Sequence, residues 1–555
     1  MLSQINRFLR HIEVPNDTLT CLTMLSSPDI EPLLLALHQW GFFSYYGYWG
    51  IPNLTIWTWS TGSALVDLGL NVKHAMGAIT LANLLISMYI CLNSVAGTRY
   101  RIGFSVSQRM VFGIYGSIFS IIVRFMLSLI LYGAQSWLGG ILLVVALSGF
   151  SRLFLNMKNT FSLGLNMTTR DFCGFLVFNI VQMAFLLSKP HKIDRLLVYS
   201  CGATFVAFIT ILGLCISNNH GLGPLYHQRV NMPSERTFWA WLYAIATWYG
   251  ALSPDIMNLN DFSRYARSPE RMNWGTVAAI MTTGSFVPVA GLLCASATEG
   301  TYGTPLWLPT DIILRWLQET YSTKNRAIAV IFGLIFCSSQ LSFNIVANGF
   351  AGGMSIAGII PKYATIRKGA FITALVSWAA QPWNFYNSSS VFVKLMSSIG
   401  VITTPVIALS IADFMVIRRS VIRVQHLYSS SPEDSFYFWK GFNLRSIAVW
   451  LGGVAIGLPG MIFNFSSHVK PDVALKLFFG HALFSFVGTF IAYLAVCYVF
   501  PPVEQWENTF LRFVRDVFSQ VSKQKAVATN TDEWSNEARE IRYEAESESS
   551  LRKRT

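Results

Sequence analysis

The segment Tyr249-Gly250-Ala251-Leu252-Ser253-Pro254-Asp255 interrupts an apolar run that extends over residues 237–258. A similar segment of small and polar residues, Trp59-Ser60-Thr61-Gly62-Ser63, interrupts the apolar run 44–70. Inside a membrane, an interrupted helix is tolerated only where its free backbone groups line a cavity or bind other protein groups. Two interruptions at corresponding positions therefore predict a transporter with inverted repeats and a binding site at mid-depth. Helix-packing contacts through Gly and Ser are the alternative interpretation.

The composition of the chain also indicates a membrane protein. Of the 555 residues, 53% are hydrophobic and only 12% are charged, whereas soluble proteins carry about 25% charged residues. These values exclude a soluble multidomain protein, a disordered chain and a disulfide-rich secreted module. A membrane-spanning helix needs about 20 mostly apolar residues. Twelve such runs lie near residues 44–70, 74–95, 114–146, 172–189, 196–216, 237–258, 274–298, 327–350, 368–386, 390–416, 445–466 and 475–500. We therefore predict an all-α polytopic membrane protein with twelve transmembrane helices.

The loops between these runs predict the orientation of the chain. An even number of spans places both termini on one side, and Lys and Arg are more frequent in the loops on the side of the N-terminus. Because cytoplasmic loops carry the excess of positive charge, we predict a multi-pass protein of the plasma membrane with both termini cytoplasmic. The predicted parts are an N-terminal segment (1–43), two five-helix halves (44–216 and 237–416), two final helices (445–500) and a largely disordered tail (504–555).

The charge and the cysteines exclude other function classes. The net charge of +13 comes from Lys and Arg scattered between apolar runs, so we expect a lipid bilayer and no nucleic acid as partner. The eight Cys form no Cys-x-x-Cys motif, which predicts free thiols and no metal site. Because the sequence also lacks a nucleotide-binding loop and a catalytic constellation, it predicts neither an enzyme nor a bound cofactor.

Several longer motifs follow one another along the chain, namely Ser27–Pro32, Arg101–Ser117, Tyr132–Gly140, Asn258–Tyr265 and Ser342–Asn348. Together they resemble the signature motifs of the nucleobase–cation symporter-1 family over roughly residues 25 to 500. This resemblance implies a LeuT-like fold, in which ten core helices form two inverted five-helix repeats and two further helices are peripheral. It also implies alternating access around a mid-depth site made by helices 1, 3, 6, 8 and 10.

Two other strings, Gly113-Ile-Tyr-Gly116 and Pro382-Trp-Asn-Phe-Tyr-Asn-Ser-Ser-Ser390, resemble the fungal branch of this family that carries thiamine and nicotinamide riboside. The resemblance implies secondary active import of a small heterocyclic vitamin or nucleoside, with a cationic ring as the expected substrate. Thiamine is the first candidate and nicotinamide riboside the second. A uracil, uridine or allantoin permease is the alternative, and a transporter-like nutrient sensor with a signalling tail is a more remote one.

Helix 3 of this family supplies a glutamine to the substrate site, and Gln135 occupies the matching position. One turn earlier, nucleobase carriers of the family have an aromatic residue that stacks on the flat ring, whereas this chain has Leu131. Residues four apart lie on one helix face, so both side chains are predicted to face the substrate. The stacking platform for a neutral base is then absent. An interhelical hydrogen bond is the alternative role for Gln135.

In helix 1, the site glutamine of the family corresponds to Ser60, which Trp57 and Trp59 flank. Aromatic faces suit a delocalised cation such as a thiazolium or pyridinium ring. We predict that Ser60 and Trp59 line the site, because both lie at the interruption of the helix. For Trp57, helix packing or a place at the membrane interface is the favoured interpretation.

Helix 6 contributes Gly250, which matches the glycine where the family's backbone approaches substrate closely. Asp255 is unusual, because an ionisable side chain within a span is energetically unfavourable and often functional. It is predicted either to bind a cationic substrate or to carry a coupling proton; a helix cap or a buried ion pair is the alternative. Asp67 in helix 1 raises the same question more weakly. Arg124 in helix 3 is interpreted as structural, held by a carboxylate or by carbonyl groups.

The residues of helix 8 indicate which ion is coupled to transport. In the sodium-coupled bacterial hydantoin carrier of the family, small residues and two consecutive hydroxyls help to hold sodium, and the matching positions here are Ser339, Ser342 and Phe343. A phenyl ring cannot ligate a hard cation, so we predict proton coupling, or transport without a coupling ion, rather than sodium coupling. The candidate ion-coupling residues are Asp255, Ser339 and Ser342. Asn348 is the predicted polar contact to the substrate in this helix.

Overall fold

The computed structural model describes residues 25–66, 68–188, 190, 193–228, 232–384, 389–466 and 472–501. The predicted tail (504–555), residues 1–24 of the predicted N-terminal segment and Asp67 lie outside these described residues. Within them the chain is helical and has no strand, apart from two isolated bridges, Trp40–Ala266 and Trp439–Phe442. The prediction of an all-α protein is therefore confirmed.

Each of the twelve predicted apolar runs coincides with one or more helices. In the described part of the chain, eight spans are long and apolar enough to cross a membrane. They correspond to α4 (Val72–Asn93) with α5 (Val95–Tyr100), α7 (Ser117–Phe150), α10 (Asp194–Asn219), α14 (Pro269–Tyr302), α16 (Thr323–Asn344) with α17 (Ala351–Ile359), most of α19 (Ser389–Ile411), α20 (Leu444–Phe465) and α22 (His481–Val499). The other four runs contain shorter or less apolar helices, which are α2 (Phe42–Asn53) with α3 (Ile56–Val66), α9 (Thr169–Phe185), α12 (Ser234–Met257) and α18 (Ile366–Val376).

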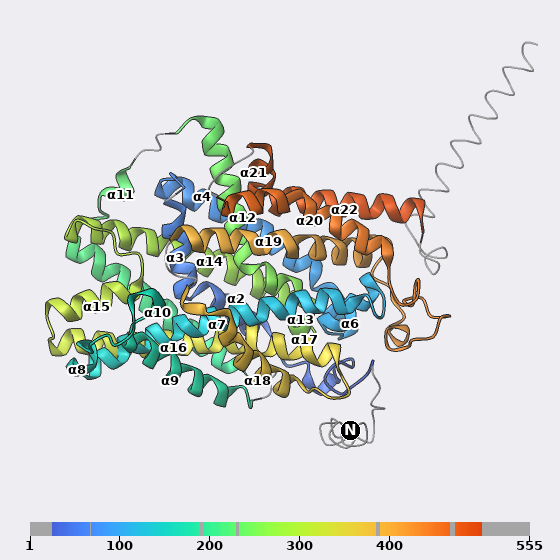
Figure 1. Cartoon of the computed structure of the whole chain (residues 1–555), viewed down its shortest axis with the longest axis horizontal. Helices are drawn as coiled ribbons and strands as arrows, with labels where there is room; N and C mark the ends of the chain where they lie inside the picture. The colour runs from blue at the N-terminus through green and yellow to red at the C-terminus, as the bar shows by residue number, and fades with distance from the viewer. Residues whose placement is uncertain are drawn as a thin grey trace, which may run out of the picture.

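The long helices lie roughly side by side along the longest axis of the molecule (Figure 1). Helix α7 packs against α16 and α9, α12 packs against α19 and α4, and α14 packs against α2. Helices α20 and α22 pack on α19 at one side of this bundle. The short helices α8 (Arg152–Leu155) and α15 (Pro309–Glu319) lie at one end, and α6 (Phe104–Phe112) lies towards the opposite end.

The interruption of helix 1 does not lie at Trp59–Ser63, as the sequence suggested, but at Leu54 and Thr55 between α2 and α3. Side-chain hydroxyls satisfy the backbone oxygens that the break leaves free. Thr55 and Thr58 donate to the Pro52 carbonyl at 3.0 and 2.8 Å, and Ser339 of α16 donates to the Leu54 carbonyl at 2.8 Å. Ser60 instead donates to the Ile56 carbonyl within α3 at 2.8 Å, so its polar group fits an unbroken helix.

Helix 6 is also unbroken where an interruption was predicted. Helix α12 continues through Gly250–Asp255 to Met257, and the chain leaves the helix only at Asn258, before the short α13 (Asn260–Ser263). Pro254 has no N–H for the Gly250 carbonyl, but the Ser253 hydroxyl donates to this oxygen at 3.0 Å. The hydrogen bond replaces the missing backbone donor, which explains why the helix tolerates its proline.

Residues 25–40 cross the α6 end of the bundle and connect distant parts of the chain. The Asp29 carboxylate accepts a hydrogen bond from the Ile366 backbone N–H at the start of α18, at 2.9 Å. The Asp29 carbonyl accepts one from Arg264 at 3.1 Å, and the Ile30 carbonyl accepts one from the Tyr428 hydroxyl at 2.9 Å. The motif Ser27–Pro32 therefore joins the end of helix 6, the start of helix 9 and the loop after helix 10.

Candidate functional site

A small cavity lies where α2, α3, α7, α12 and α16 meet. Its volume is about 20 Å³, which is room for a single water molecule. Binding of a ring-containing substrate therefore requires the surrounding helices to move apart. The lining residues are Pro52, Trp57, Thr58, Leu131, Gln135, Trp248, Ala251, Leu252, Asp255, Phe343 and Asn348.

Four of the predicted substrate-binding residues line this cavity, namely Leu131, Gln135, Asp255 and Asn348. Leu131 and Gln135 contribute from one face of α7, as their spacing of four residues predicted. Gln340 of α16 donates to the side-chain and backbone oxygens of Gln135. The interhelical hydrogen bond considered as an alternative is therefore present at a residue that also lines the cavity.

Trp59, Ser60 and Gly250 do not line the cavity. Trp59 is fully buried and packs against Phe208 of α10, with ring centroids 4.8 Å apart. The break at Leu54 explains this difference, because it places Trp57 and Thr58 at the cavity and turns Trp59 to another face of α3.

Gly250 serves the packing of two helices. A Cβ atom at this position would lie 2.1 Å from the Met396 carbonyl oxygen of α19. Only glycine permits this close approach, so the alternative of a small-residue packing contact holds for Gly250.

Five lining residues had not been predicted, which are Pro52, Thr58, Trp248, Ala251 and Leu252. The three on α12 share a helical face with Asp255, because they precede it by seven, four and three residues. Their spacing is visible in the sequence, but the assumption of a break at Gly250 concealed it. An unbroken helix 6 would have predicted the whole face.

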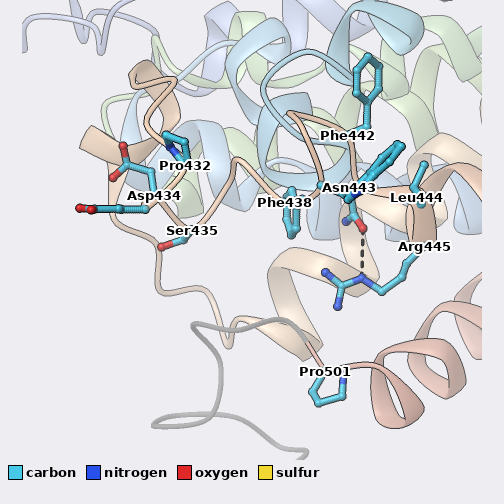
Figure 2. Close-up of a pocket in the computed structure, with 11 residues that line it drawn as sticks. Pro432, Asp434, Ser435, Phe438, Phe442, Asn443, Leu444, Arg445 and Pro501 are labelled. Atoms are coloured by element: carbon cyan, nitrogen blue, oxygen red, sulfur yellow. Dashed lines mark hydrogen bonds between the residues drawn. The ribbon is translucent and has the colours of Figure 1, made fainter.

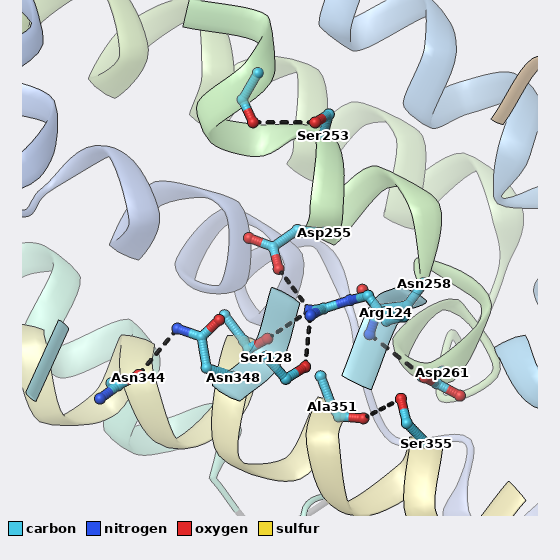
Figure 3. A network of polar contacts seen from close by, with 12 residues as sticks. Arg124, Ser128, Ser253, Asp255, Asn258, Asp261, Asn344, Asn348, Ala351 and Ser355 are labelled. Carbon is cyan, nitrogen blue, oxygen red and sulfur yellow. Dashed lines mark hydrogen bonds and ion pairs between the residues drawn. The ribbon is translucent and has the colours of Figure 1, made fainter. Parts of the chain in front are cut away.

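Asp255 forms a buried ion pair with Arg124 of α7 (Figure 3). The distance between Arg124 Nη2 and Asp255 Oδ1 is 3.4 Å, and the two side chains are 0% and 8% exposed. Arg124 makes shorter hydrogen bonds to the Ala347 carbonyl (2.7 Å) and the Ser128 hydroxyl (2.6 Å). The guanidinium is thus held chiefly by the Ala347 carbonyl and the Ser128 hydroxyl. The Asp255 carboxylate can therefore still bind another cation or a proton.

Asn348 lies in a stretch of wider, π-helical turns, Ile345–Phe350, between α16 and α17. Such stretches are frequent at functional sites, because the extra residue changes the direction of the side chains. The Asn348 amide donates to Asn344 at 2.9 Å, and Asn344 donates to the Tyr132 carbonyl at 3.0 Å. These bonds fix the amide of Asn348 beside the cavity.

The candidate ion-coupling hydroxyls of α16 bind protein groups. Ser339 donates to the Leu54 carbonyl, as described above. Ser342 donates to the Ser338 carbonyl at 2.6 Å and lies 3.1 Å from the Ser200 hydroxyl. Phe343 lines the cavity beside them. Among the described residues, no group of three or more His, Cys, Asp and Glu could hold a metal ion.

A larger cavity of about 390 Å³ lies at the start of α20, near Pro501 (Figure 2). Phe438, Asn443 and Arg445 are among its lining residues, and Arg445 Nε donates to Asn443 Oδ1 at 3.2 Å. None of its lining residues belongs to α2, α3, α7, α12 or α16. The cavity between α2, α3, α7, α12 and α16 is our candidate transport site, because four of the predicted substrate-binding residues line it.

Comparison with known proteins agrees with this architecture. Residues 36–484 match the family described as permeases for cytosine/purines, uracil, thiamine and allantoin. The chain belongs to this family. As a member of the nucleobase–cation symporter-1 family it is a membrane transporter and not an enzyme.

Two relatives from Saccharomyces cerevisiae show the extent of the similarity within the family. The chain is 38% identical to nicotinamide riboside transporter 1 over 501 residues, which cover 90% of this chain and 83% of the relative. It is 36% identical to the thiamine transporter over the same proportions of both chains. The uracil permease of the same yeast is 28% identical, over 86% of this chain and 77% of the relative.

The fold of this family member resembles that of Mhp1, a nucleobase–cation symporter-1 transporter. The closed conformation of Mhp1 with bound bromovinylhydantoin matches with a TM-score of 0.67 at 18% identity, covering 86% of this chain and 97% of Mhp1. The inward-facing conformation matches with a TM-score of 0.65, covering 86% of this chain and 96% of Mhp1. The predicted LeuT-like fold is confirmed.

Proposed function

We propose that this symporter imports a small cationic heterocycle, with thiamine as the first candidate and nicotinamide riboside as the second. One observation carries the proposal: the aromatic side chains of Trp57, Trp248 and Phe343 line the same cavity as the Asp255 carboxylate. Aromatic faces attract a delocalised cation, and a carboxylate pairs with its charge. Thiamine and nicotinamide riboside both carry a cationic aromatic ring.

A permease for uracil, uridine or allantoin is the second candidate. It is less well supported because Leu131 offers no aromatic face to a neutral ring, and no other aromatic side chain of α7 lines the cavity. The identity to the uracil permease is also lower than that to the thiamine and nicotinamide riboside transporters. A nutrient sensor is the most remote candidate.

We assign substrate contacts to Leu131, Gln135, Asp255 and Asn348, which were predicted from the sequence, and to Trp57 and Trp248. The proposed coupling ion is the proton. Phe343 has no oxygen for a sodium ion, and the Ser339 hydroxyl donates its proton to the Leu54 carbonyl oxygen. Asp255 is then the proposed proton carrier, because its carboxylate lies at the cavity.

We place the transporter in the plasma membrane with both termini cytoplasmic, so that the α6 end and the segment 25–40 face the cytoplasm. The boundaries 44–216 and 237–416 are our proposal for the two inverted repeats. The positive charge of the inner loops supports this orientation.

The test is uptake of labelled thiamine, nicotinamide riboside, uracil and allantoin at equal concentration in yeast cells that lack their own carriers. We expect uptake of one or both cations to exceed that of the neutral compounds. Faster uracil or allantoin uptake would contradict the proposal.

A further inference from the structure

Trp248 forms a wall of the cavity, and its indole nitrogen is bound from behind. Its Nε1–H donates to Asn83 Oδ1 of α4 at 2.7 Å. The Asn83 amide donates in turn to the Ser285 hydroxyl of α14 at 3.0 Å. Asn83 and Trp248 are 0% and 1% exposed, so water does not replace the bond between them. Trp248 is thus connected through Asn83 to a helix that does not line the cavity.

Asn83 lies close to the backbone of α14. A Cβ atom at Gly284 of α14 would lie 3.1 Å from Asn83 Oδ1 and 3.3 Å from the amide nitrogen of Asn53. The Asn53 amide, at the end of α2, donates to Thr283 at 3.2 Å. Residues 283–285 of α14 therefore contact the amides of Asn83 and Asn53. Asn83 binds Trp248, and Asn53 follows Pro52; both Trp248 and Pro52 line the cavity.

We infer that Asn83 is a positioning residue that sets the plane of the Trp248 indole and thereby the preference of the site for a cationic ring. A tryptophan side chain has two rotatable bonds, so an N–H held in one direction leaves the ring a single plane. Attraction of a cation to an aromatic ring requires the ring face to point at the charge. The inference rests on the proposed function, because it assumes a cationic substrate.

The test compares Asn83→Ala with Asn93→Ala. Asn93 lies on the same helix and also binds α12, but through the Ile256 backbone carbonyl at 2.6 Å. Inhibition of labelled thiamine uptake is measured with nicotinamide riboside and with its uncharged dihydro form, which differ in the ring charge. We expect Asn83→Ala to raise the inhibition constant of the cation by about fivefold or more. The inhibition constant of the uncharged dihydro form should change little in Asn83→Ala. Asn93→Ala should leave the ratio of the two inhibition constants unchanged.

A double-mutant cycle with Trp248→Phe identifies the partner. Phenylalanine keeps an aromatic face but has no N–H, so Asn83→Ala should have no further effect on the ratio in this background. An equal effect of Asn83→Ala in both backgrounds, or equal behaviour of Asn83→Ala and Asn93→Ala, would overturn the inference. If Asn83→Ala does not reach the membrane, the ratio of the two inhibition constants is measured in Ser285→Ala instead. This substitution removes only the anchor of Asn83 and should shift the ratio in the same direction, whereas an unchanged ratio refutes the inference.

Failure of the proposed function gives a different result. In that case the wild-type protein takes up neither thiamine nor nicotinamide riboside, before any variant is made. Failure of the inference alone leaves wild-type uptake intact and the ratio of the inhibition constants unaffected by Asn83→Ala.

Discussion

At the scale of single residues, Asp255 and Arg124 place two opposite charges in the middle of the helix bundle. Asp255→Asn keeps the shape of the side chain and removes its charge. If the carboxylate binds the substrate or carries the proton, uptake should fall tenfold or more, which corresponds to about 1.4 kcal/mol. Initial uptake rates, corrected for the amount of protein at the cell surface, measure this effect. Near-normal uptake would remove Asp255 from the site.

A second variant separates function from stability. Asp255→Asn leaves the buried Arg124 without its carboxylate, and an unpaired buried charge destabilises a protein by about 3–5 kcal/mol. The double variant Arg124→Gln/Asp255→Asn removes both charges, so it should recover surface expression. Uptake should nevertheless remain low. Recovery of uptake in the double variant would show that Asp255 only balances Arg124.

At the scale of helices, α12 depends on the Ser253 side chain to remain helical at Pro254. Ser253→Ala leaves the Gly250 carbonyl without a donor and also removes the acceptor of Thr403, which donates to Ser253 at 2.7 Å. We expect a loss of about 1–2 kcal/mol in stability, measured as a lower Tm of the purified protein. Ser355→Ala is the control, because Ser355 donates to Ala351 within a continuous helix. Equal Tm values for both variants would contradict this account.

The connection between residues 25–40 and α18 gives a prediction at the same scale. Asp29→Ala removes the acceptor of the Ile366 N–H, and loss of such a helix cap destabilises by about 1 kcal/mol. Cleavage by trypsin at the exposed Arg367 and Lys368 should become several-fold faster, because local opening becomes more frequent. Asp29→Asn retains an acceptor and should be intermediate. An unchanged cleavage rate in Asp29→Ala would show that Asp29 does not hold the segment.

At the scale of the whole molecule, transport requires a rearrangement, because a cavity of about 20 Å³ is too small for a ring-containing substrate. The energy for accumulation is predicted to come from protons. In liposomes with the membrane potential set to zero by potassium and valinomycin, an inward proton gradient should drive accumulation of labelled thiamine. Replacement of sodium by N-methylglucamine should have no effect. A strict sodium requirement would contradict the interpretation of Phe343.

The approximate positions of the apolar helices could be derived from the sequence alone. A helix needs about 20 apolar residues to span a lipid bilayer. Because this requirement applies to one segment at a time, each span is visible in the sequence as an apolar run. For the same reason, the spacing of Leu131 and Gln135 correctly predicted one helix face. The carboxylate within an apolar run led to Asp255, and a family motif led to Asn348.

The positions of the helix breaks were decided by tertiary structure. A break occurs where other groups satisfy the free carbonyls, and in helix 1 one of these groups is Ser339, which is far away in the sequence. In α3, which begins after this break, Trp57 and Thr58 line the cavity, whereas Trp59 and Ser60 do not. Gly250 faces α19 because two backbones meet there. Which polar groups satisfy each other across helices depends on the packing of the whole bundle, and no periodicity within one segment contains that information.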